Sequence, residues 1–158
     1  YWKFDEPSGS RADPRGGNTL ADHNSVTSKL GKKGDAAQLT RANSAYLSAA
    51  DNASLSLGTD TAYTVACWVY LDSKTNHMAF IAKYEAGIGS KDVEYRIFYY
   101  ADTDRFAFDG GNGTTSFVFN ANSFGSPSPA TWYFIVAWHD PTADTVNIQV
   151  NNGTVDSA

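Results

Sequence analysis

Two acidic residues are spaced so that their carboxyl groups could act together on one substrate. Asp92 and Glu94 stand at positions i and i+2, which places two side chains on the same face of a β-strand. Cleavage of a glycosidic bond requires a pair of carboxyl groups flanking that bond. However, no third acid follows on this segment, and only three of the 17 acidic residues are Glu. We therefore expect ordinary surface charges here and predict that the protein is not an enzyme.

Residue types suited to nucleophilic catalysis are present but scattered. The three His lie far apart in the sequence, and no Gly-x-Ser-x-Gly motif occurs. The single cysteine, Cys67, lies in an apolar run, so we expect a buried, inert thiol that forms no internal disulfide. A triad assembled from distant residues stays an alternative, because triads are recognised by geometry rather than by sequence order.

Two segments alternate polar and apolar residues in a way that could hold a sugar. A pyranose ring presents one apolar face and a belt of hydroxyl groups, so its site needs an aromatic surface beside hydrogen-bonding groups. The period of two places such groups on one face of residues 94–100 and of residues 145–151. A solvated outer face with no ligand is the alternative. The predicted ligand-binding residues are Arg96, Tyr100, Asn147, Gln149 and Asn151.

The elements that must position these side chains are predicted to be strands. No helical periodicity is sustained, whereas short runs of aromatic and β-branched residues recur between turn residues. Asn152-Gly153 suits a tight hairpin turn, and residues 6–33, rich in Gly, Asp and Asn, are expected to form an extended loop. We expect Trp68, Trp132 and Trp138 in the core or between the sheets. The predicted strands are residues 1–4, 36–39, 45–48, 63–71, 77–84, 94–100, 105–109, 116–120, 131–140, 145–151 and one beginning at Thr154.

Composition and charge narrow the class of protein. A chain of 158 residues fits one domain, and 14% aromatic with 18% charged residues is typical of a folded β-rich protein. The net charge is −5, and no basic residue follows Arg105, so we expect no nucleic-acid binding. No apolar run is long enough to span a bilayer, so we also expect no membrane insertion.

Several motifs, in order, resemble those of laminin-G-like, concanavalin A-like domains. The resemblance runs from Tyr1 to about Val155 and implies an all-β, two-sheet antiparallel jelly-roll sandwich in a single domain over residues 1–158. Each motif alone is common, but their order and spacing are more specific. The motifs are residues 2–9 with Asp13 and Gly16-Gly17-Asn18, residues 31–37, Tyr46-Leu47, Leu55-Ser56-Leu57, residues 63–70, residues 132–136 with His139-Asp140, and residues 146–153.

The same resemblance points to a metal ion. Laminin-G-like domains frequently hold calcium at the rim of the sandwich, and Asp13, Asn18 and Asp22 lie in the loop that resembles one contributor. Carboxylate and amide oxygens are ligands that Ca²⁺ accepts. Calcium is therefore the expected cofactor if there is one; the alternative is that Asp and Asn occur here because they favour turns.

The predicted function is a non-catalytic recognition or adhesion module. We expect it to bind carbohydrate or a glycoprotein surface within a larger extracellular or surface-displayed protein. The domain is expected to be truncated or excised at its C-terminus, because the resembling family has further strands after the Asn-Gly hairpin. An exposed sheet edge would then suit a neighbouring protein chain. The alternatives are a structural or decoration domain of a particle, fibre or multidomain surface assembly with no sugar ligand and, more distantly, a glycoside hydrolase.

Overall fold

The computed structural model describes residues 1–57, 60–84, 93–111 and 115–158. Within these ranges the chain forms twelve strands and two short 3-10 helices, η1 (Arg41–Asn43) and η2 (Ala53–Leu55). Neither helix, nor any other described segment, is a helix with the length and apolar character needed to cross a bilayer. The chain divides into two compact units, Tyr1–Leu55 and Ser56–Ala158, and each is described by itself. The prediction of one domain over residues 1–158 stays a prediction.

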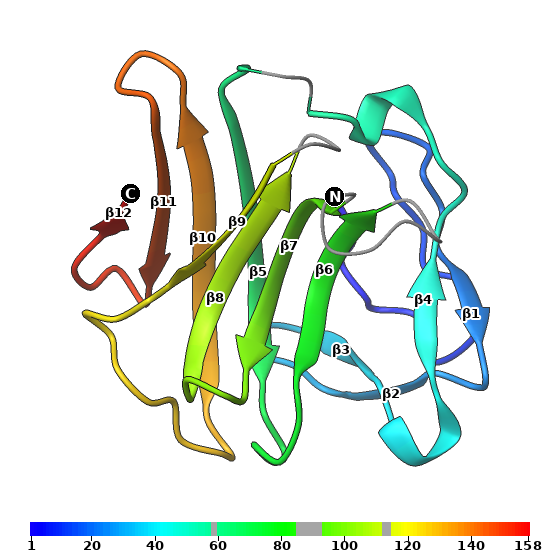
Figure 1. Cartoon of the computed structure of the whole chain (residues 1–158). Helices are drawn as coiled ribbons and strands as arrows, with labels where there is room; N and C mark the ends of the chain where they lie inside the picture. Colours follow the sequence, from blue (N-terminus) through cyan, green and yellow to red (C-terminus); the bar gives the residue numbers. More distant parts are fainter. Residues whose placement is uncertain (58–59, 85–92, 112–114) are drawn as a thin grey trace. The chain divides into compact units, whose positions relative to one another are not determined.

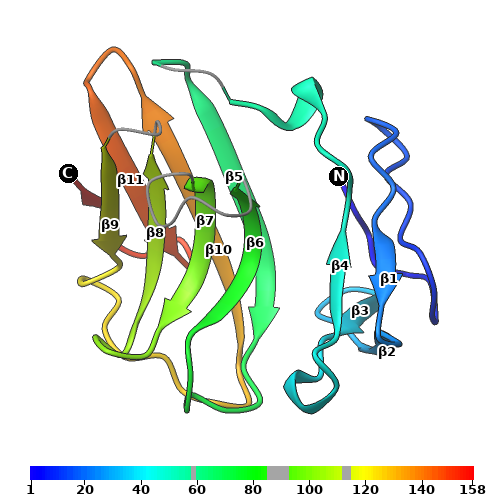
Figure 2. The ribbon, with the colours of Figure 1, turned by 45° about the vertical axis from the view of Figure 1, so that its right-hand side comes forward.

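The C-terminal unit is a sandwich of two four-stranded antiparallel sheets (Figures 1 and 2). One sheet has the order β12-β11-β10-β5 and the other has the order β6-β7-β8-β9. The predicted all-β, two-sheet jelly-roll fold is therefore confirmed. The strands are β5 (Tyr63–Tyr70), β6 (Met78–Tyr84), β7 (Val93–Tyr100), β8 (Arg105–Gly111), β9 (Ser116–Asn120), β10 (Trp132–Asp140), β11 (Thr145–Val150) and β12 (Asp156–Ser157).

The core of this unit lies between the two sheets. Alternation along each strand directs every second side chain inward, and aromatic rings meet across the gap. Phe106 of β8 lies 5.0 Å from Tyr133 of β10, and Phe108 lies 6.3 Å from Tyr63 of β5, ring centre to ring centre. Burying one such large apolar side chain contributes about 1.5–3 kcal/mol. The largest fully buried members of the cluster are Leu71, Ile97, Tyr99, Phe106, Phe108, Ile135, Ile148 and Val150.

The connections at one end of the sandwich are joined by Asp104, in the turn between β7 and β8. Its carboxylate accepts hydrogen bonds from the Tyr99 hydroxyl at 2.7 Å, from Lys74 Nζ at 2.8 Å and from the Ser126 hydroxyl at 2.5 Å. These donors lower the pKa of Asp104 well below its ordinary value, and the bond from Lys74 has the largest effect. One side chain therefore connects the β5–β6, β7–β8 and β9–β10 segments.

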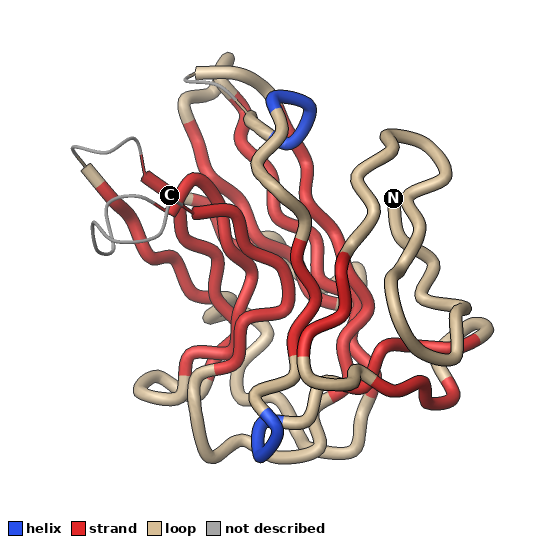
Figure 3. The backbone as a smooth tube through the Cα atoms, turned by 90° about the vertical axis from the view of Figure 1, so that its right-hand side faces the viewer, coloured by secondary structure: helices blue, strands red, loops and turns tan. Residues whose placement is uncertain are grey.

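The N-terminal unit consists of two small antiparallel pairs and much loop (Figure 3). β1 (Ala21–His23) pairs with β4 (Tyr46–Ser48), and β2 (Thr27–Leu30) forms a hairpin with β3 (Asp35–Gln38). The buried side chain of Arg11 donates hydrogen bonds to the carbonyls of Gly9 and Val26. The Asp22 carboxylate accepts the N–H groups of the same two residues. Polar groups therefore organise much of this unit.

Several predicted elements differ from the structure. Residues 1–4 form no strand, and Phe4 has a φ of 62°, which extended chain does not have. The loop predicted over residues 6–33 contains β1 and β2, whose short, mostly polar sequences carry no strand alternation. The turn after β11 has Asn151 and Asn152, both with positive φ, at its centre in place of Asn152-Gly153, and β12 begins two residues later than predicted.

The prediction that Trp68, Trp132 and Trp138 lie in the core or between the sheets is wrong. In β5 the residues Val65 and Val69 point into the core, so alternation turns Trp68 outward, where its side chain is 48% exposed. From ring centre to ring centre, Trp68 lies 5.2 Å from Phe134, and Trp132 lies 5.4 Å from Tyr70. Trp138, six residues after Trp132 in the same strand, shares this outward phase. The core cluster of the described residues contains Tyr and Phe rings but none of these three tryptophans.

Candidate functional site

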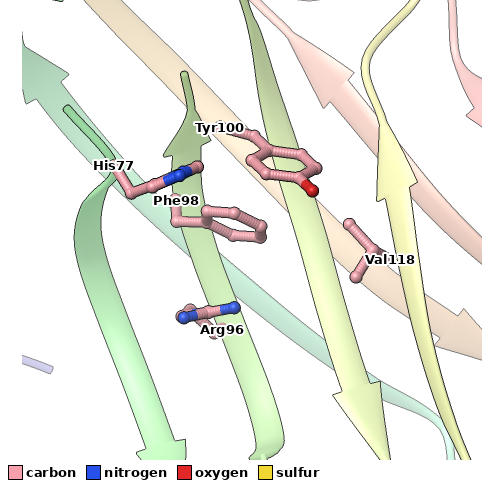
Figure 4. Close-up of a pocket in the computed structure, with 5 residues that line it drawn as sticks. All are labelled: His77, Arg96, Phe98, Tyr100 and Val118. Carbon is pink, nitrogen blue, oxygen red and sulfur yellow. The ribbon is translucent and has the colours of Figure 1, made fainter. Parts of the chain in front are cut away.

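The outer face of the sheet β6-β7-β8-β9 carries the candidate site. Alternation along β7 sends Tyr95, Ile97 and Tyr99 into the core, so Arg96 and Tyr100 project from the opposite face together with Phe98 (Figure 4).

A hollow of about 300 Å³ lies on this face. The cross-strand neighbours of Phe98 are Ala79 on β6 and Ala107 on β8, and their small side chains leave space above the sheet. Phe98 itself is 4% exposed, because the Arg96 guanidinium covers its ring at 4.2 Å and the Tyr100 ring lies at 5.5 Å. Phe98 thus forms the floor, and Tyr100 is the more accessible ring. The lining residues are His77, Arg96, Phe98, Tyr100 and Val118.

Arg96 is held in place by a two-point ion pair with Asp109 of β8. Its Nε donates to Oδ1 of Asp109 at 3.0 Å, and Nη2 donates to Oδ2. The Asp109 side chain is 6% exposed; burial raises the pKa of its carboxyl group, while the hydrogen bonds from Arg96 act in the opposite direction. A guanidinium carries five N–H groups. The bonds to Asp109 use Nε and Nη2, so within the described residues Nη1 has no hydrogen-bond partner, and Arg96 is among the residues that line the hollow.

His77 and Tyr100 form one wall of the hollow, and Val118 forms another part of the rim (Figure 4). The two rings lie 5.1 Å apart. Nδ1 of His77 accepts the N–H of Ala101 at 3.3 Å, and Nε2 lies 3.5 Å from the Asp102 carboxylate. The site therefore offers an aromatic wall, an apolar contact at Val118, which is 52% exposed, and N–H donors.

The structure brings together only two of the five residues predicted to bind a ligand. Arg96 and Tyr100 line the hollow, whereas the three polar residues of residues 145–151 belong to the other sheet or the turn beside it. Their side chains bond locally. Asn147 donates to Thr145 Oγ1 and accepts from Ser157, Gln149 donates to the carbonyl of Gly153, and Asn151 accepts the N–H of Phe134.

Sequence reasoning missed two residues of the site, His77 and Val118. His77 lies just before β6, and Val118 lies on a strand that was predicted correctly. The register places Val118 opposite Asp109, and Asp109 opposite Arg96. The alternation of residues 116–120 would have placed Val118 on the outer face, but only the pairing of β7, β8 and β9 shows that these residues meet.

The geometry of the predicted calcium ligands does not fit a shared ion. Oδ1 of Asp13 accepts the N–H groups of Arg15 and Gly16 and the N-terminal amine, and Oδ2 accepts the N–H of Asn18. These bonds, the one to Gly16 foremost, lower the pKa of Asp13 far below its ordinary value. Asp22 directs both of its oxygens to other backbone N–H groups. The described ranges contain no group of three or more His, Cys, Asp or Glu side chains arranged to hold a metal.

Of the two acids considered for hydrolysis, Glu94 is bonded to other parts of the fold and Asp92 is not among the described residues. Glu94 accepts the N–H of Leu57 through Oε1 and binds Lys83 Nζ at 2.6 Å through Oε2. Asp92 lies outside the described residues. Burial raises the pKa of the Cys67 thiol to about 12, which makes it a poor nucleophile at neutral pH.

Comparison with known families agrees with this architecture. A family model described as the concanavalin A-like lectin/glucanases superfamily matches residues 41–158, which is most of the chain. Comparisons with curated proteins and with solved structures gave no match.

Proposed function

The chain belongs to the concanavalin A-like lectin/glucanases superfamily, and from this premise we propose that it is a non-catalytic module that binds carbohydrate or glycoconjugate. At the level of the superfamily, membership supports a recognition or adhesion role. We assign the binding to the hollow on the outer face of β6-β7-β8-β9. The observation that carries this assignment is the combination of the Tyr100 ring, the apolar contact at Val118 and the unpaired N–H groups of Arg96 in one concave site.

These groups match the surface of a sugar. The apolar face of a pyranose packs on an aromatic ring, and its hydroxyl groups accept hydrogen bonds from N–H donors. The volume of about 300 Å³ lies at the lower end of the range of small-molecule sites, roughly 300–1,000 Å³. The strands beneath the hollow are held in place, because the side chains of their inner faces pack in the core.

A recognition role without catalysis is supported by the state of the carboxyl groups on this face. Glycosidases need two carboxyl groups about 5–10 Å apart on either side of the scissile bond. Among the described residues, Asp109 on this face is paired with Arg96, and Glu94 near the start of β7 is paired with Lys83. Substitution of Glu94 by Gln is therefore not expected to change any trace of hydrolytic activity, whereas a glycosidase would lose it.

The wider setting belongs to the same proposal. An extracellular or surface-displayed location, within a larger protein, suits a module that meets glycans. The outer strands of the two sheets are β12, β5, β6 and β9, and a sheet edge is a place where a neighbouring protein chain can pair. A calcium ion remains a prediction, and a chelator arm in the binding experiment tests it.

A glycan array tests the proposed function. The wild-type protein is expected to bind at least one glycan specifically, and Tyr100→Ala is expected to weaken that binding at least about tenfold through the loss of apolar ring contact. Gln149→Ala is the matched control, since Gln149 lies on β11 of the other sheet and donates to the carbonyl of Gly153, and it should bind as the wild type does. Circular dichroism checks that each variant is folded.

Failure of the wild-type protein to bind any glycan, with and without chelator, would contradict the proposal. The same result is what a structural or decoration domain without a sugar ligand predicts. Equal loss of binding in Gln149→Ala and Tyr100→Ala would place the ligand elsewhere.

A further inference from the structure

We infer that the hollow on β6-β7-β8-β9 takes a single neutral sugar ring, whose adjacent hydroxyl groups bind the free edge of the Arg96 guanidinium, and that it discriminates against acidic sugars. This inference rests on the proposed function, because it specifies the ligand of the same site.

The lining of the hollow carries little net charge. Among its described residues, Arg96 alone has a permanent charge, and Asp109 already neutralises it through two hydrogen bonds. An acidic ligand on Arg96 would set a second anion against one cation. Its removal from water would then lack a compensating charge, which makes binding unfavourable. His77, the other basic group of the lining, lies beside the Asp102 carboxylate.

The charges beyond the lining do not reverse this balance. Arg105 is the cross-strand neighbour of Tyr100, but the same turn contains Asp102 and Asp104, and Asp104 is engaged by Lys74. On the other side of Arg96, Lys83 is paired with Glu94. The chain as a whole carries a net charge of −5, which adds long-range repulsion of anions.

The geometry of the Arg96 donors suits a pair of neighbouring hydroxyl groups. A guanidinium presents two edges with paired N–H groups, and Asp109 occupies the edge formed by Nε and Nη2. The remaining edge, Nη1 with the second N–H of Nη2, can donate to two neighbouring oxygens. Two adjacent sugar hydroxyls supply such oxygens without a negative charge.

The size of the hollow and its apolar walls suit a single ring. The hollow of about 300 Å³ is small for a small-molecule site, which favours one ring over an extended chain. Tyr100 and Val118 supply apolar area for the less polar face of that ring. The combination of apolar walls and a neutralised guanidinium therefore selects an uncharged ring with neighbouring hydroxyl groups.

The test compares four classes of glycan that differ in charge. Arrays and calorimetry are run with neutral hexosides, uronic acids, sialylated glycans and sulfated glycans as probes. The wild-type protein is expected to bind a neutral ring at least about tenfold more tightly than any acidic counterpart. Stronger binding of uronic, sialylated or sulfated sugars would overturn this inference but leave the proposed function standing. No binding to any class would overturn both.

Two variants give the test a second readout. Asp109→Asn removes the compensating anion and keeps the shape of the side chain, so binding should shift toward acidic sugars by about tenfold. Arg96→Lys keeps the charge but loses the paired N–H edge, so it should weaken the neutral ligand without creating acidic preference. Gln149→Ala should leave the ratio of neutral to acidic binding unchanged. An unchanged ratio in folded Asp109→Asn protein would overturn the inference; if that variant does not fold, the wild-type ratio and Arg96→Lys decide it.

Discussion

At the scale of single residues, Asp104 shows how one carboxylate stabilises an end of the sandwich. It accepts bonds from Tyr99, Lys74 and Ser126 while its own φ is 54°. Asp tolerates this left-handed conformation better than most residues. The hairpin between β10 and β11 has Asp144 in the same conformation, with a φ of 52°. The two positions therefore share backbone geometry but differ in hydrogen bonding.

Asp104→Asn should lower the melting temperature at pH 7 more than Asp144→Asn does. The folded state lowers the pKa of Asp104, so its charge contributes stability that is fully present above the pKa of an unfolded Asp, about 3.9. That contribution is lost as the pH falls further, toward the pKa of the folded state. The stability difference between wild type and Asp104→Asn should accordingly shrink below about pH 4, as thermal melts from pH 7 to pH 2.5 would show. A difference that is constant across this range would contradict the assigned role.

Asp13 illustrates why the residue type alone did not identify its role. Short acids in a loop fit both a calcium site and a turn, and the difference lies in where the lone pairs point. Here the backbone N–H groups of Arg15, Gly16 and Asn18 converge on the two Asp13 oxygens. A sequence does not show this convergence, because it depends on the path of the following five residues.

Asp13→Ala should therefore destabilise the protein equally in calcium and in chelator. The substitution removes the acceptors for backbone N–H groups. The resulting loss of stability comes from these hydrogen bonds and does not depend on a bound ion. Thermal melts of wild type and variant in both buffers measure it, with Asp144→Asn at an exposed turn as the control, since Asn tolerates the left-handed backbone of that residue. A wild-type melting temperature that rises with calcium, and an Asp13→Ala protein that does not respond, would instead support an ion at this position.

At the scale of elements, β7 is the strand whose function follows most directly from its sequence. The period of two separated its two faces, and the structure places Ile97 at 0% exposure in the core and Arg96 on the hollow. The same reasoning on residues 145–151 gave three polar residues on one face, but their partners come from the turn and from β10 and β12. Alternation thus predicts which face a side chain takes, whereas the ligands of that face depend on neighbouring strands.

Ile97→Ala and Val118→Ala test the assignment of faces. Removal of the fully buried Ile97 side chain should cost about 2–5 kcal/mol in the free energy of unfolding. Val118 is 52% exposed, so its substitution should cost less than about 1 kcal/mol. Urea denaturation measures both values, and a loss for Val118→Ala as large as or larger than that for Ile97→Ala would contradict this assignment.

The β1 and β2 strands of the N-terminal unit escaped prediction for a physical reason. Their sequences, Ala-Asp-His and Thr-Ser-Lys-Leu, lack the apolar alternation by which a half-buried strand is recognised. Their pairing is supported instead by backbone ladders and by polar side chains such as Arg11 and Asp22. Sequence patterns therefore predicted the C-terminal sandwich well and the N-terminal unit poorly.

At the scale of the whole molecule, charge and architecture point to recognition of an uncharged surface. The chain carries a net charge of −5 and has no basic residue after Arg105, which disfavours polyanionic partners. The match to the concanavalin A-like superfamily over residues 41–158 supplies a fold on which recognition sites are common. The net charge and the superfamily match are independent observations, because one concerns electrostatics and the other concerns descent.

Salt should have little effect on the binding of the glycan. Attraction between opposite charges weakens as ionic strength rises, since the screening length falls from about 10 Å at 0.1 M to about 3 Å at 1 M. A neutral ring held by hydrogen bonds and ring contacts lacks that dependence. Calorimetry at both salt concentrations should give dissociation constants within about a factor of two, and a tenfold weakening would indicate an anionic ligand.

The location of the bound sugar is the sharpest test of the proposed binding site. Backbone amide shifts of the labelled protein, recorded while the best glycan from the array is titrated in, report which residues meet the ligand. The largest changes are expected at Arg96, Phe98, Tyr100 and Val118 around the hollow. Changes confined to Asn147, Gln149 and Asn151 on the opposite sheet would contradict it.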